Sequence, residues 1–145
     1  LGINNINTIY KKSFLLNKII NQNAGTDIIS VYKRASSILE SELKNKDVEL
    51  TNTTDSGIFK NEYEKSLYKK LKELQKYFAN INKDENYELT LSNLGSFKKV
   101  VFEFFDNVIV NDKDKNIKKN RLELLQMLCK TFDNYLNFSN IESSQ

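Results

Sequence analysis

Apolar residues recur every three or four positions along most of this chain, which is the spacing of one face of an α-helix. Similar runs cover roughly residues 4–22, 26–43, 91–108 and 117–132. Strand-like alternation is weak, and the stretch VIVN at 108–111 is too short to change the class. The pattern predicts an all-α bundle of about five helices. The clearest run occupies residues 59–81, and its members are Phe59, Tyr63, Leu67, Leu71, Leu74, Phe78 and Ile81.

Polar segments separate the expected helices. Residues 44–57, with the sequence KNKDVELTNTTDSG, are rich in turn formers and are expected to form a loop, and NKDEN at 82–86 reads as a shorter turn. A chain of 145 residues is the usual length of one domain, so we expect residues 1–145 to form a single α-helical domain. Because the first residue is Leu1 and not methionine, we also expect this domain to be a piece of a longer protein.

The composition excludes most kinds of active site. The chain has no histidine, and its four glycines are isolated, so neither a histidine-based catalytic or metal site nor a glycine-rich phosphate loop can be built. We therefore expect no catalytic residue, no metal site and no cofactor within this chain. A lone cysteine, Cys129, is expected to be a buried apolar side chain in a reducing, cytoplasmic compartment, and no apolar run is long enough to span a membrane.

A stripe of lysines runs along the expected third helix. The formal net charge of the whole chain is only +3, from 22 Lys and Arg against 19 Asp and Glu, and A+T-rich coding accounts for much of the lysine. Glu62, Glu64 and Glu73 are close enough in sequence to pair with some members of the stripe. An ordinary solvated helix face is therefore the favoured interpretation. The stripe consists of Lys65, Lys69, Lys72 and Lys76.

The expected second helix carries small hydroxyl side chains and two cations opposite its apolar face. Small side chains around cations let a phosphate or a base edge approach closely, and arginine can also stack on a base. A solvated face remains the commoner reading of such a pattern. The residues concerned are Ser30, Lys33, Arg34, Ser37 and Ser41.

The last expected helix opens with cations, although the macrodipole favours anions at a helix start. Arg121 lies four residues after Ile117 and beside the apolar face, so it requires an anionic partner. Asp106, at the end of the preceding helix, is the expected partner in a structural ion pair, and a contact of Arg121 with RNA is the alternative. Lys118 and Lys119 are expected to point elsewhere and to be available for phosphate.

Two stretches resemble a known family. VYKRASSIL at 31–39 and FFDNVIVNDKDKNIKKNRLELLQML at 104–128 resemble two segments of the bacterial glycyl-tRNA synthetase β subunit, and FSNI at 138–141 is similar to its closing motif. The order and separation of the three also agree. In that family this region is a C-terminal, α-helical anticodon-binding domain of the type shared with arginyl-tRNA synthetases, whereas the ATP and glycine sites belong to a separate α subunit.

The resemblance implies an RNA-binding role for six residues. Lys33 and Arg34 would read bases, with Ser37 and Asn120 next, while Lys118 and Lys119 would neutralise phosphate. Ser37 stands where the family has asparagine and Lys118 where it has arginine, which weakens bidentate recognition at both positions. The implied partners are glycine tRNA and, through the rest of the chain, the α subunit of an α2β2 ligase.

Two alternatives remain open from the sequence. A helical bundle of this kind can instead dock to the rest of its own chain or to a partner subunit. It can also be an adaptor unrelated to translation, whose charged surface reflects composition alone.

Overall fold

The computed structural model describes residues 23–44, 48–51, 53–80 and 87–136. Within these ranges there are four α-helices and a single 3-10 turn, with no strand, which confirms the all-α class. The elements are α2 (Asn23–Lys44), η1 (Ser56–Ile58), α3 (Glu62–Asn80), α4 (Tyr87–Asn107) and α5 (Lys115–Leu136). The helix expected at 4–22, the turn at 82–86 and the motif at 138–141 lie outside the described residues.

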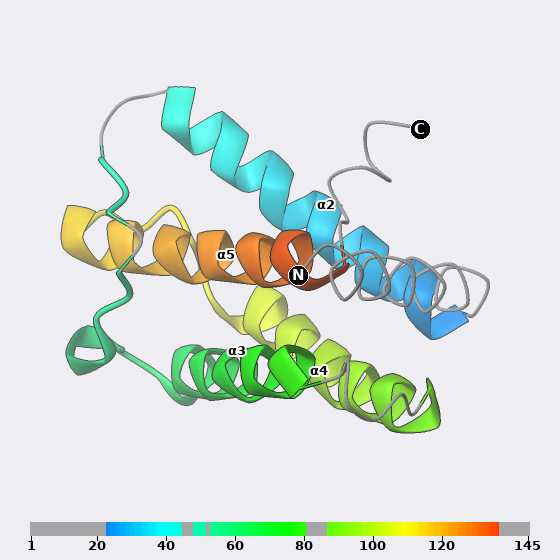
Figure 1. Cartoon of the computed structure of the whole chain (residues 1–145). Helices are drawn as coiled ribbons and strands as arrows, with labels where there is room; N and C mark the ends of the chain where they lie inside the picture. Colours follow the sequence, from blue (N-terminus) through cyan, green and yellow to red (C-terminus); the bar gives the residue numbers. More distant parts are fainter. Residues whose placement is uncertain (1–22, 45–47, 52, 81–86, 137–145) are drawn as a thin grey trace, which may run out of the picture.

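The four helices form one bundle. Both α2 and α3 pack against α4 and α5. Figure 1 shows α5 running through the centre of the bundle, with α2 on one side and α3 and α4 on the other. The central helix α5 therefore contacts both α2 and α3.

Aromatic side chains from three helices meet in the core. Phe132 of α5 is fully buried, and its ring centroid lies 5.4 Å from that of Phe97 on α4 and 6.2 Å from that of Phe78 on α3. The expected apolar face of α3 is buried along most of its length, from Leu67 to Phe78. Cys129 is buried, as its sequence context predicts.

Side-chain caps set where two of the helices begin. The Asn61 carbonyl oxygen Oδ1 accepts from the backbone N–H of Glu64 at 3.0 Å, just ahead of α3. Asp114 does the same for α5, accepting from the N–H groups of Asn116 at 2.8 Å and Ile117 at 3.4 Å. Such caps satisfy N–H groups that have no partner inside the helix. The last helix therefore begins at Lys115, two residues before the apolar pattern begins.

Candidate RNA-binding surface

The polar face of α2 is presented to solvent at the positions that the sequence indicated. Arg34 and Ser37 are exposed and Lys33 is half-buried, while Ala35 on the opposite side is fully buried. Ser30 and Ser41 are also exposed, so small hydroxyl side chains flank the two cations. The two cations thus lie on a polar face of α2 where the neighbouring exposed side chains are small.

The guanidinium group of Arg34 lies over the ring of Phe105 on α4, with Cζ 4.3 Å from the ring centroid. A cation–π contact of this kind at an exposed site contributes about 0.5–1 kcal/mol. It also holds the planar guanidinium group while leaving its in-plane N–H donors available. Sequence reasoning missed Phe105, because nothing in the spacing indicates which helix covers this side of α2.

Lys118 is buried, and the expectation that it is available for phosphate is wrong. Its residue is only 4% exposed, and Nζ lies 2.8 Å from Oε2 of Glu42 on α2. The physical reason is the packing of α2 on α5, which brings a carboxylate onto this side of α5. Lys118 therefore joins two helices within the protein.

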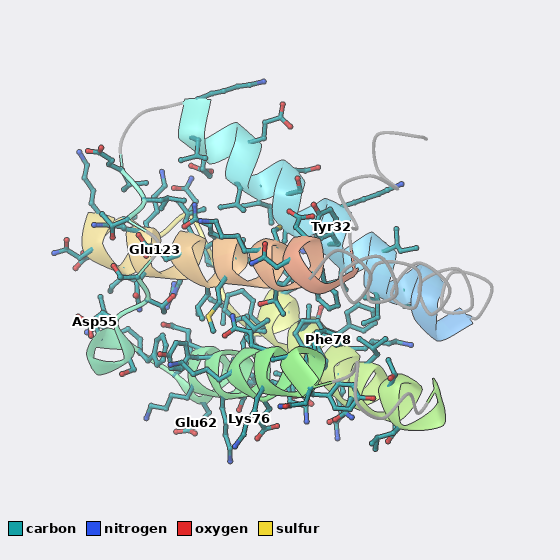
Figure 2. All side chains as sticks on the ribbon, viewed as in Figure 1. Tyr32, Asp55, Glu62, Lys76, Phe78 and Glu123 are labelled. Atoms are coloured by element: carbon teal, nitrogen blue, oxygen red, sulfur yellow. The ribbon has the colours of Figure 1, made fainter. Side chains whose placement is uncertain are left out.

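Asn120 also holds the protein together. Its Oδ1 accepts from the backbone N–H of Asp55 at 2.7 Å, and its Nδ2 donates to the backbone carbonyl of Asp55 at 3.0 Å. One turn further on, Oε1 of Glu123 accepts from the backbone N–H of Thr51 at 2.6 Å. Figure 2 shows Asp55 and Glu123 at the same end of the bundle, where the segment before η1 passes the first half of α5. These bonds fasten the segment 48–58 to α5.

Lys119 is half-buried and borders a hollow of about 400 Å³. The same hollow is lined by Thr51, Asp55, Asn116 and Glu123. Of the three polar residues expected to meet RNA at the start of α5, Lys119 is the one that is not buried.

Arg121 forms the structural ion pair expected of it, but the predicted partner is wrong. Its Nε and Nη2 donate to Oε1 of Glu64 on α3, at 3.0 and 2.8 Å, and its Nη1 lies 3.3 Å from Oδ2 of Asp112. Nη1 also donates to the backbone carbonyl of Ile109 at 2.7 Å. Asp106 is exposed on the last turn of α4, so the carboxylate from α3 occupies the buried position instead.

Two of the cations near the start of α5 are thus balanced by carboxylates from other parts of the fold. Glu42 meets Lys118, and Glu64 and Asp112 meet Arg121. A signal for Glu64 was present in the sequence, because it lies three residues before Leu67 and therefore in register with the apolar face of α3. An acid in that register and an arginine beside an apolar face are natural partners for a buried pair.

Comparison with known proteins identifies the family of this chain. Residues 28–145 match the family model of the DALR anticodon binding domain. The chain belongs to this family. The resemblance noted in the sequence is confirmed, and the helical architecture is the one expected of a DALR domain.

The DALR domain is also similar to curated glycine–tRNA ligase β subunits. It is 33% identical over 138 residues to that of Rickettsia prowazekii, 33% over 141 residues to that of Rickettsia africae, and 32% over 126 residues to that of Rickettsia canadensis. These alignments cover 95%, 97% and 87% of this chain, but only 20%, 20% and 18% of the relatives. The chain therefore spans about a fifth of the length of the relatives it matches.

Two further properties of the described part of the DALR domain bear on its chemistry. Its described side chains include no group of three or more His, Cys, Asp or Glu that could hold a metal ion. None of its four described helices is long and apolar enough to cross a membrane.

Proposed function

We propose that this chain is the anticodon-binding domain of a glycine–tRNA ligase β subunit and that it binds the anticodon loop of glycine tRNA. The observation that carries the proposal is the DALR family match over residues 28–145. Similarity to the Rickettsia glycine–tRNA ligase β subunits over nearly the whole chain supports the choice of glycine tRNA.

The exposed face of α2 is the proposed reading surface. Single-stranded loops present splayed bases that proteins recognise by stacking and by hydrogen bonds to base edges. Arg34, held on the ring of Phe105, offers N–H donors to base carbonyls, while Ser37 leaves room for a base to approach. Lys33 lies one residue from Arg34, and Lys119 supplies a further cation for phosphate at the start of α5.

Lys118 and Asn120 have a different place in this proposal. Both are buried and bonded within the protein, to Glu42 and to the backbone of Asp55. They act on RNA through the position of α5 and of the segment 48–58, and not by direct contact.

The whole enzyme would attach glycine to its tRNA with ATP at the α subunit, in an α2β2 assembly in the cytoplasm. This domain would contribute by orienting the tRNA. Contacts to the α subunit would come from the rest of the longer chain.

A second candidate function is protein docking. Ile109, between α4 and α5, is 73% exposed, while its carbonyl is held by Arg121. An exposed apolar side chain on a fixed backbone suits a contact with another part of the subunit or with a partner subunit.

The deciding experiment is a titration of this chain with glycine tRNA and with the same tRNA carrying a swapped anticodon, across a range of salt concentrations. Anticodon binding predicts tighter binding of the unaltered tRNA. It also predicts a log–log salt slope of about −0.7 per phosphate neutralised on a single strand. Equal binding of the two tRNAs would contradict anticodon reading, and no binding of either would favour the docking function.

A further inference from the structure

A hollow lies between α3 and α5. It has a volume of about 500 Å³ and is lined by residues of α3, α5 and the segment 48–58. This volume falls within the range of about 300–1,000 Å³ that is usual for small-ligand pockets. Its lining combines an aromatic ring, Tyr68, with a lysine, Lys72, and amide side chains from Gln75, Gln126 and Asn134.

Two buried acceptor oxygens on residues of this lining have no hydrogen-bond partner among the residues that the structure describes. Glu123 is 2% exposed, and its Oε1 accepts from Thr51 while its Oε2 has no partner. Oε1 of Gln126 is buried and also has none. A buried acceptor without a partner destabilises a fold, so a ligand that supplies N–H donors here would bind with a favourable contribution.

One lysine of the α3 stripe, Lys72, lines the hollow, and the others extend from it along the same helix. Glu62 pairs with Lys65, and Glu73 pairs with Lys70, while Glu64 turns inward to Arg121. The remaining members of the stripe, which are Lys69, Lys72 and Lys76, are exposed and form no ion pair with a described residue.

Lys72 connects the lysine stripe to the hollow. Its Nζ lies 5.1 Å from the centroid of the Tyr68 ring, and both residues line the hollow. Figure 2 shows Lys76 on the side of α3 that is turned away from α5, so the stripe continues from the mouth of the hollow onto the outer surface.

We propose that this groove is a second single-strand RNA site, in which the stripe Lys69, Lys72 and Lys76 neutralises phosphates and the hollow receives one base that carries an exocyclic amino group. The ring of Tyr68 offers an apolar surface for the base, as aromatic side chains do in other single-strand sites. When the base enters, the side chains of Glu123 and Gln126 turn their unpartnered oxygens, which are buried in the free protein, toward its amino group. The inference deepens the proposed function by adding a second contact for the same RNA.

The lysine stripe is tested with a short single-stranded probe. The probes are heptamers of cytidine and of uridine, which differ in having an amino group or a carbonyl oxygen at one ring position. The triple variant Lys69→Gln/Lys72→Gln/Lys76→Gln should bind the cytidine heptamer about tenfold or more weakly at low salt, with a shallower salt slope. Its control, Lys60→Gln/Lys99→Gln/Lys113→Gln, removes the same charge from exposed positions away from the groove and should change binding little.

The base pocket is tested by Gln126→Met, which keeps the side-chain volume and removes the acceptor. The wild-type chain should prefer cytidine to uridine, and the variant should lose about fivefold of that preference, as expected for one hydrogen bond. Asn134→Trp, at an exposed position of the lining, should lower the affinity for both heptamers, whereas Asn134→Ala should not. Circular dichroism checks that each variant is folded.

The outcomes separate this inference from the proposed function. The groove would be overturned as an RNA site if the wild-type chain binds the two heptamers equally, or if the triple variant binds as tightly as its control. Either result counts against it even if the chain discriminates the anticodon of glycine tRNA. If the wild-type chain does not discriminate the anticodon but the heptamer results are as expected, the proposed function is overturned and the RNA site in the groove is retained.

Discussion

Arg121 of α5 donates two hydrogen bonds to a single oxygen of Glu64 on α3, although the two residues are 57 positions apart in sequence. Their side chains are 8% and 1% exposed, so this is a buried pair. The same guanidinium group also holds the backbone carbonyl of Ile109 and reaches Asp112. One side chain thus ties α5 to α3 and to the connection that follows α4.

Removing one member of this pair is expected to be costly. Arg121→Ala leaves the Glu64 carboxylate buried without its partner and should lower the free energy of unfolding by about 3–5 kcal/mol. Replacing both residues, as Arg121→Met with Glu64→Leu, should recover much of that loss. Urea unfolding of the two variants measures the difference. A loss of under about 1 kcal/mol in the single variant would contradict the buried pair.

Arg34 should affect stability and RNA binding to different degrees. Arg34→Ala loses the contact with the Phe105 ring and should destabilise the fold by about 0.5–1 kcal/mol. If the side chain reads the anticodon, the variant should also lose about 1–3 kcal/mol of binding to glycine tRNA, by analogy with base contacts in DNA.

The control for Arg34 is Phe105→Leu, which keeps the arginine and removes the ring beneath it. Because the guanidinium group is then no longer stacked, this variant should weaken tRNA binding less than Arg34→Ala does. Full anticodon discrimination by a folded Arg34→Ala variant would remove Arg34 from the reading surface.

Asn120 should be needed for the placement of the segment 48–58. Asn120→Ala removes both part-buried hydrogen bonds to the backbone of Asp55, and should cost about 1–3 kcal/mol because each such bond contributes about 0.5–1.5 kcal/mol. Hydrogen exchange of the amides from Thr53 to Ile58 should accelerate. Asn120→Asp keeps an acceptor for the Asp55 N–H and should give a smaller acceleration at that amide. Unchanged exchange in both variants would contradict a role of Asn120 in holding this segment.

Phe132 should be among the most sensitive core positions. It is fully buried between Phe78 and Phe97, so Phe132→Ala should lower the free energy of unfolding by about 3–5 kcal/mol through lost burial and a residual cavity. Phe132→Leu fills more of the space and should cost less. Thermal unfolding followed by circular dichroism ranks the two, and an equal effect would indicate that the site collapses around the alanine.

The helices themselves could be predicted from the sequence because they depend on local spacing. The face from Leu67 to Phe78 is buried as its period predicts, and the exposed face that carries Arg34 and Ser37 lies where the pattern places it. The start of α5 was expected too late because Asp114 acts as a cap beyond the apolar pattern. Periodicity shows which residues share a helix face, whereas a cap depends on the backbone geometry of a turn.

The sequence by itself therefore determined the helical class, the buried faces and the resemblance to an anticodon-binding family. It also indicated that Arg121 seeks an anionic partner, because its position beside an apolar face removes part of the side chain from water. Only the tertiary structure decided that this partner is Glu64 instead of Asp106, that Lys118 meets Glu42, and that Asn120 holds Asp55. Each of these contacts joins elements far apart in sequence, so the residues that pair depend on which helix faces pack together. Helical spacing within one segment does not indicate which other segment will pack against it.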